Sequence, residues 1–162
     1  MLFRSVHPFH SVKYIREVVR PQVAAGAERA GRSLADVALV SSVFTITGRN
    51  EAEVDAMRRV AREQIAFYAS TPTYRVVLAA HGWEDVGEQL SRLAAMKRWS
   101  QMGELITDAM LEVFAVQAPL DRLGQALRAR YEGVLDRVFG YVPYQPGPLD
   151  AVWRDAAAAV QG

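Results

Sequence analysis

Two histidines near the start of this 162-residue chain have the type and spacing to do chemistry. His7 and His10 stand three residues apart around Pro8 and Phe9. A neutral imidazole can hydrogen-bond a substrate, accept a proton or ligate a metal. A metal site needs further ligands, and the sequence has neither an HExxH motif nor a cysteine, so no metal is assigned. The two histidines are therefore candidates for substrate or cofactor contact, with a structural loop role as the alternative.

A second group of candidates lies between Ile65 and Trp83, where two helical runs meet at Ser70-Thr71-Pro72. Its members combine ring or hydroxyl groups that suit the wall of a ligand pocket: Tyr68, Thr71, Tyr74, His81 and Trp83. Helix packing is the alternative, because aromatic residues at helical spacing usually belong to a core. Ser70 and Thr71 are equally explained as helix caps, and Gly82 as a helix terminator.

Composition narrows the class of protein. With 51% hydrophobic and 23% charged residues, the chain fits one globular unit over residues 1–162. A net charge of +1 gives no strong field toward nucleic acid or an anionic membrane, so neither is expected as a partner. The absence of cysteine excludes disulfides and thiol nucleophiles and permits a reducing compartment. No apolar run approaches the roughly 20 residues that cross a bilayer, and we expect a cytoplasmic protein.

Helices and strands alternate in the pattern that must position these residues. Ser11 caps a predicted helix that ends near Gly31, and Pro21 predicts a kink or break within it. The β-branched run 37–48 predicts a buried strand. Asn50 with Glu53 resembles a capping box that begins a long helix.

Shorter elements are predicted in the second half of the chain. We expect helices from Pro72 to about Ala80, at 86–94, at 97–114 with a fresh cap at Thr107, and at 119–133, then a strand at 138–142, a proline-rich turn and a terminal helix at 149–160. Strands separated by helices imply parallel pairing through crossovers. A complete (β/α)8 barrel needs about 250 residues, so this chain is too short for one.

Several motifs, in their order along the chain, resemble the luciferase-like flavin or deazaflavin oxidoreductases, in particular the branch dependent on coenzyme F-420. They are His-Pro-Phe-His at 7–10, Tyr14, Ala-Gly-x-x-Arg-Ala-Gly-Arg at 25–32, Thr47-Gly48, the segment 65–83, and Arg130-Tyr131 before Asp136-Arg137-Val138. The resemblance implies a helix-rich α/β fold, namely the C-terminal portion of a (β/α)8 TIM barrel truncated at its N-terminal side. On that basis Val6 follows a barrel strand, 37–47 and 136–142 are the last two strands, and 68–114 form a helical excursion.

The same resemblance implies an oxidoreductase that transfers hydride between coenzyme F-420 and a small organic substrate. An FMN-dependent monooxygenase of the same fold and a non-enzymatic helical binding or dimerisation module are the alternatives. Family members hold the cofactor mainly with loops from earlier strands, so we expect this chain to be inactive alone and to need the N-terminal half of the barrel as its partner. Homo-oligomerisation is left open, and no catalytic residue is assigned.

Basic residues offer one more candidate interaction. Lys97-Arg98 and the group Arg128, Arg130 and Arg137 could attract an anionic substrate or the acidic tail of a deazaflavin. Solvated surface charge and helix ion pairs are the alternative explanation.

Overall fold

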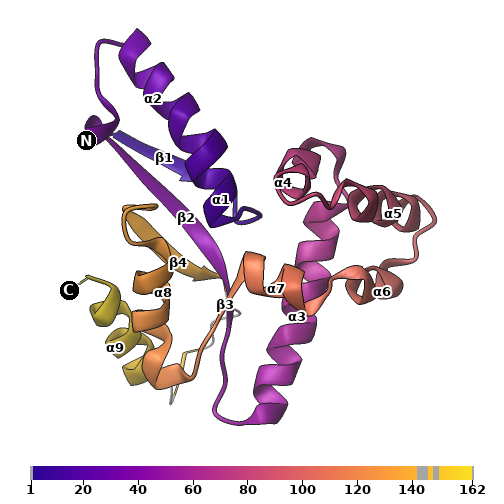
Figure 1. Ribbon diagram of the computed structural model, residues 1–162. Helices are drawn as coiled ribbons and strands as arrows, with labels where there is room; N and C mark the ends of the chain where they lie inside the picture. The colour runs from indigo at the N-terminus through magenta and orange to yellow at the C-terminus, as the bar shows by residue number, and fades with distance from the viewer. Residues whose placement is uncertain (1, 142–145, 148–149, 162) are drawn as a thin grey trace.

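Four parallel strands form the sheet of this protein, whose computed structural model describes residues 2–141, 146–147 and 150–161. The strands are β1 (Leu2–Val6), β2 (Val37–Ile46), β3 (Ala115–Gln117) and β4 (Arg137–Tyr141). β2 pairs with each of the other three (Figure 1). Phe44 pairs with both Ala115 and Tyr141, so β3 and β4 lie on opposite edges of β2. Because Ser41 likewise pairs with both Val6 and Val138, β1 and β3 follow one another along the same edge.

The predicted parallel pairing is therefore confirmed, with one correction. The strand β3 was not expected. Along the chain it comes between β2 and β4, which were expected to be consecutive strands. It has only three residues, too few to show an alternating pattern. β1 ends at Val6 and β4 covers residues 137–141, whereas Val142 lies outside the described residues.

The crossover from β1 to β2 is a continuous helical segment. It consists of α1 (Val12–Tyr14), a π-helical turn η1 (Ile15–Val19) and α2 (Arg20–Arg29), followed by the short η2 (Leu34–Asp36). Ser11 caps α1 as predicted, since its hydroxyl accepts the Tyr14 amide. The predicted disturbance near Pro21 takes the form of the π turn, because proline has no amide to continue the regular ladder.

A group of helices fills the span between β2 and β3. They are α3 (Glu51–Ala69), η3 (Pro72–Tyr74), α4 (Arg75–Ala79), α5 (Glu84–Ala95), α6 (Trp99–Met102), η4 (Gly103–Leu105) and α7 (Asp108–Phe114). Asn50 caps α3 as predicted, but the Glu53 carboxylate accepts the Arg49 amide and not the Asn50 amide of a capping box. The helix expected over 97–114 is divided into three, with the predicted cap present at Thr107.

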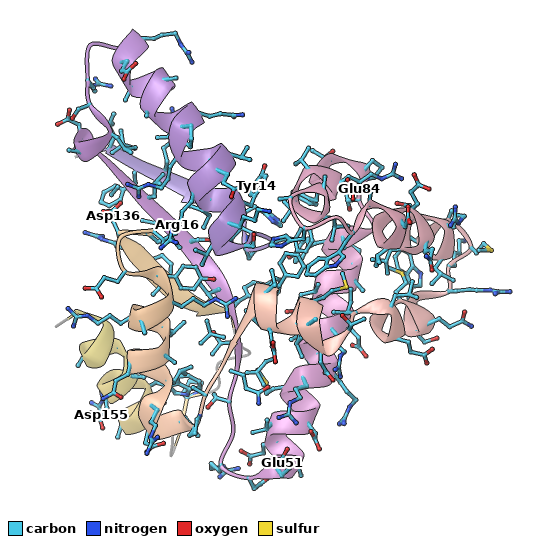
Figure 2. All side chains as sticks on the ribbon, in the orientation of Figure 1. Tyr14, Arg16, Glu51, Glu84, Asp136 and Asp155 are labelled. Atoms are coloured by element: carbon cyan, nitrogen blue, oxygen red, sulfur yellow. The ribbon has the colours of Figure 1, made fainter. Side chains whose placement is uncertain are left out.

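The chain returns through η5 (Leu120–Arg122) and α8 (Leu123–Tyr131), and the final described helix is α9 (Asp150–Gln161). The amide and carbonyl of Leu39 bond the Asp136 carboxylate and amide respectively, which fixes the start of β4 against β2; Figure 2 labels Asp136. Within the described residues, no helix is long and apolar enough to cross a membrane.

Alternation along β2 divides the core into two parts. Phe44 and Ile46 pack with α3 and the following helices, whereas Leu39 and Val43 pack with α8 and η1. Figure 1 shows α3 to α7 gathered beside the carboxyl end of β2 and α8 with α9 beside the sheet. The sheet therefore has an outer face covered by crossover helices and an inner face whose carboxyl end meets the helical excursion of residues 68–114.

Candidate functional site

His7 follows β1 directly and so lies at the carboxyl edge of the parallel sheet, the edge on which (β/α)8 enzymes build their active sites. Its imidazole stacks on Tyr74, with ring centres 4.5 Å apart, and meets the edge of Tyr68 at 4.7 Å. The Phe9 amide donates to His7 Nδ1 at 3.1 Å. Burial lowers the pKa of His7, which favours the neutral imidazole. Because Nδ1 accepts the Phe9 amide, the neutral ring carries its proton on Nε2.

Tyr68 joins α3 to the last residue of β4. The Tyr68 and Tyr141 hydroxyls lie 3.2 Å apart, and the Phe44 ring is close to both tyrosine rings, at 6.2 Å and 5.4 Å. The hydrogen bond to Tyr141, with a smaller contribution from burial, raises the pKa of Tyr68 to about 12. Tyr68 therefore stays protonated and offers a neutral hydroxyl at the carboxyl edge.

His81 and Trp83 form a second aromatic group. Their rings stack at 4.9 Å, and Phe114 lies 6.0 Å from His81 and 5.9 Å from Trp83. Phe9 connects this group to the first, because its ring is 4.8 Å from Phe114 and also contacts Tyr68 and Tyr74. Burial, and secondarily the charge of Lys13, lowers the pKa of His81.

A hydrogen bond ties this second group to the crossover helix. His81 Nε2 lies 2.7 Å from the Ser11 hydroxyl, which also accepts the Tyr14 amide as the N-cap of α1. Tyr14, labelled in Figure 2, lies at this meeting of α1 with the helical excursion. His81 therefore positions the excursion against the first turn of α1.

His10 faces away from this edge and is only 1% exposed. Its Nδ1 donates to the His7 carbonyl at 2.8 Å and lies 3.3 Å from the Ser41 hydroxyl, which itself donates to Val6. Burial lowers the pKa of His10 to about 4, which keeps the ring neutral. The geometry favours the structural alternative for His10, since its hydrogen bonds fix the loop that presents His7.

Thr71 is the N-cap residue that precedes the 3₁₀ turn η3, but its side chain makes no capping hydrogen bond. The expected helix cap at Thr71 is therefore wrong. A capping hydroxyl must point back at amides of the first turn, and here the turn is closed by the backbone alone, through the Tyr74 amide and the Thr71 carbonyl. The Ser70 hydroxyl instead donates to the Phe67 carbonyl.

The structure thus brings three of the seven predicted residues, His7, Tyr68 and Tyr74, into direct contact. His81 and Trp83 stand in the connected second group, and His10 and Thr71 do not join either ring cluster. Sequence reasoning missed Tyr141 and Phe44, which share the inner face of the sheet through their register. The alternation of Phe139 with Tyr141 was the available signal, but it could not show which strand lay alongside.

Two of the basic residues considered as ligand contacts, Arg130 and Arg137, have partners within the protein. Arg130 donates to the Ala115 carbonyl at 2.8 Å and to the Glu112 carbonyl at 2.6 Å, and so caps the end of α7. Arg137 lies over the Phe3 ring at 4.8 Å. These contacts favour the structural explanation for both arginines. Among the described residues, no group of three or more His, Asp or Glu side chains could hold a metal.

Residues 5–137 match the luciferase-like monooxygenase family. The chain belongs to this family. It is 46% identical over 132 residues to the uncharacterized proteins Rv1360 of Mycobacterium tuberculosis and Mb1395 of Mycobacterium bovis. The match covers 82% of this chain and 39% of each relative, so the chain spans about two fifths of their length.

The fold agrees with this membership. The coenzyme F-420-dependent tetrahydromethanopterin reductase of Methanopyrus kandleri superposes on 93% of this chain and 40% of its own, with a TM-score of 0.62 and 23% sequence identity. The expected helix-rich portion of a luciferase-like TIM barrel is therefore confirmed. Within such a barrel, His7 and Tyr141 stand at the carboxyl ends of two luciferase-like strands.

Proposed function

We propose that this chain is the C-terminal portion of an oxidoreductase that transfers hydride between coenzyme F-420 and a small organic substrate, and that it is inactive alone. The observation that carries the proposal is the cluster of His7, Tyr68 and Tyr141 at the carboxyl edge of a luciferase-like sheet. The relationship to an F-420-dependent reductase of the same fold adds support.

The residues present suit one part of such a cofactor. Aromatic rings of Tyr68 and Tyr74 beside neutral donors can surround a planar conjugated ring or its reaction partner. The bound deazaflavin would supply the hydride chemistry. The chain's own residues orient the reacting groups and exclude water. Arg130 is committed to backbone carbonyls and Arg137 to the Phe3 ring, so neither is offered to the acidic tail of the cofactor.

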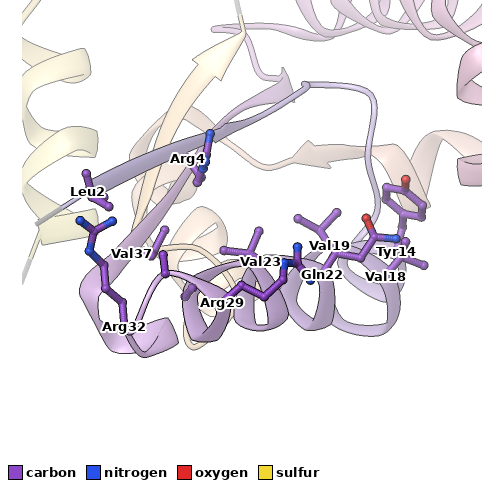
Figure 3. Close-up of a pocket in the computed structure, with 13 residues that line it drawn as sticks. Leu2, Arg4, Tyr14, Val18, Val19, Gln22, Val23, Arg29, Arg32 and Val37 are labelled. Atoms are coloured by element: carbon purple, nitrogen blue, oxygen red, sulfur yellow. The ribbon is translucent and has the colours of Figure 1, made fainter.

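The open edge of β1 supports the proposed need for the remainder of the barrel. A groove of about 420 Å³ runs between β1 and α2 and is shown in Figure 3. Val18, Val19 and Val23 line its helical side. In a (β/α)8 barrel a preceding strand pairs with this edge and its helix packs beside α2. The groove lies where that unit would sit.

An FMN-dependent monooxygenase of the same fold is the second candidate, favoured by the description of the matching family. Both candidates are tested by joining the chain to the preceding segment of its 46%-identical relative and titrating the product with F-420 and FMN. We expect F-420 to bind the joined protein and not the 162-residue chain. Tighter binding of FMN would change the electron carrier, and binding of neither would refute the enzyme proposal.

The genome provides an independent check on the proposed truncation. Sequencing the DNA upstream of the Met1 codon should find an in-frame extension that encodes several more βα units. An in-frame stop codon close to Met1, preceded by a ribosome-binding site, would contradict that expectation. Tight binding of F-420 by the isolated chain would also contradict it, because the cofactor loops are expected to be missing.

A further inference from the structure

His7 and His10 occupy one short loop but carry their protons on opposite nitrogens. The Phe9 amide can only donate, so His7 Nδ1 must accept and the neutral ring bears its hydrogen on Nε2. The His7 carbonyl can only accept, so His10 Nδ1 must donate and His10 Nε2 is bare. The loop therefore presents one fixed N–H donor, that of His7.

Among the described residues, the Nε2 atom of His7 is the part of this ring that has no hydrogen-bond partner. It makes no hydrogen bond to any described residue. Some polar side-chain atoms of the described residues are both buried and without a hydrogen-bond partner; His10 Nε2 is one of them and His7 Nε2 is not. Since His7 Nε2 also lacks a partner, it must be accessible. Stacking on Tyr74 and the edge contact with Tyr68 restrict rotation of the ring. An oriented, accessible and neutral donor costs little entropy when it binds an acceptor.

We propose that His7 Nε2–H binds the carbonyl oxygen of a small, uncharged organic substrate at the carboxyl edge of the sheet. This inference rests on the proposed function and names its substrate class. A neutral donor suits a carbonyl oxygen, and a cation would find no carboxylate among the described residues that line the cleft beside His7. That cleft has a volume of about 350 Å³.

The walls of the cleft agree with an uncharged ligand. The lining combines apolar side chains such as Phe9, Val76 and Val77 with uncharged polar ones, namely Ser5, His10, Tyr14, Thr73 and Tyr74. Arg4 is the one charged side chain among the described lining residues. Arg4 belongs to β1, whose free edge a neighbouring strand would cover in a complete barrel. The end beside His7 would then remain as part of a closed pocket, in which the ring contacts with Tyr68 and Tyr74 fix the orientation of the His7 donor.

Two substitutions separate substrate binding from a structural role of His7. In His7→Asn the amide oxygen can still accept the Phe9 amide, but the side chain is too short to place a donor at the Nε2 position. In His7→Gln the amide nitrogen reaches that position and restores the donor. A role confined to the loop predicts that Asn is the better replacement, whereas substrate binding through Nε2 predicts that Gln is.

The experiment uses the 162-residue chain, nitrogen NMR of its histidines and a matched pair of probes, cyclohex-2-enone and cyclohexene. At neutral pH, His7 should show a protonated Nε2 and His10 a protonated Nδ1. The enone should shift the His7 Nε2 resonance and bind more tightly than cyclohexene. His7→Asn should weaken enone binding roughly three- to tenfold, the loss of one hydrogen bond, while His7→Gln should stay within about twofold of the parent.

A protonated Nδ1 on His7, equal binding of the two probes, unchanged enone binding by His7→Asn, or no binding of the enone at tens of millimolar would each overturn the inference. Neither probe is a cofactor, so these outcomes are distinct from those of the F-420 and FMN titration. Failure of the joined protein to bind F-420 would refute the proposed hydride transfer and leave the His7 result standing.

Discussion

Acidification should destabilise this protein through His10. The ring is buried and its pKa is lowered from 6.5 to about 4, first by loss of solvation. Between these two values the unfolded chain binds a proton that the folded chain does not. The free energy of unfolding is therefore complete above pH 6.5 and is lost progressively as the pH falls toward 4.

The magnitude follows from the two pKa values. Linkage gives a loss of about 2 kcal/mol from this one histidine between about pH 7.5 and about pH 5. Nearly the whole side chain is enclosed, so solvent screening gives little discount. Arg130 acts in the same direction through its charge, whereas the hydrogen bond to the His7 carbonyl opposes it.

The test is urea unfolding of the parent chain and of His10→Asn, followed by circular dichroism at both pH values. Asparagine can keep a donor for the His7 carbonyl but does not titrate, so the variant should lose about 2 kcal/mol less than the parent on acidification. Its absolute stability can be lower at every pH, because a ring is replaced by a smaller group. His7→Asn is the matched control and should change the pH dependence less, since that ring is only partly buried. Equal pH dependence of the parent and His10→Asn would refute the reasoning.

Five other substitutions, in three experiments, test the packing around the site. Phe114→Ala should lower the free energy of unfolding in urea by about 3–5 kcal/mol, because the buried Phe114 ring joins Phe9 to the His81 and Trp83 pair. Its control is Phe67→Ala at a 53% exposed position, which should cost about 1 kcal/mol or less. Ser11→Ala should cost about 1–2 kcal/mol by the same assay, since it removes both the α1 cap and the partner of His81, and an unchanged midpoint would exclude that dual role. In a double-mutant cycle, Tyr68→Phe and Tyr141→Phe should show a coupling energy of about 0.5–1.5 kcal/mol, and additivity would show that the two hydroxyls do not bond one another.

Local sequence rules predicted the elements whose causes are local. The caps at Ser11, Asn50 and Thr107 were predictable because a side chain and an amide three residues away suffice to make them. The strand at 37–46 was predictable from its β-branched apolar run. By contrast, β3 exists only because β2 extends past the end of β1 and leaves part of its edge free for three more residues. The sequence of Ala115–Gln117 carries no pattern that indicates this free edge of β2.

The candidate site shows the same division. His7, Tyr68 and Tyr74 were predictable as a chemical type, but their assembly depends on a strand end, a long helix and a 3₁₀ turn meeting in space. Tyr141 is 73 residues from its hydroxyl partner Tyr68, and only the register of β4 on β2 places it there. The sequence therefore indicated candidate side chains, whereas the pairing of strands decided which of them come into contact.

The His-Pro-Phe-His loop shows why two like residues take unlike roles. His10 is buried, and its Nδ1 donates to the His7 carbonyl. His7 lies at the carboxyl edge of the sheet, and its Nδ1 accepts the Phe9 amide. The accessible Nε2 donor of His7 thus depends on the buried Nδ1 donor of His10. His10→Asn, which can preserve the inner hydrogen bond, should keep the protonated Nε2 of His7, whereas His10→Phe should free the His7 carbonyl and leave the loop in more than one conformation. Nitrogen NMR of His7 in the two variants tests this dependence. Identical His7 resonances in both variants would show that His7 is positioned by its tyrosine neighbours alone.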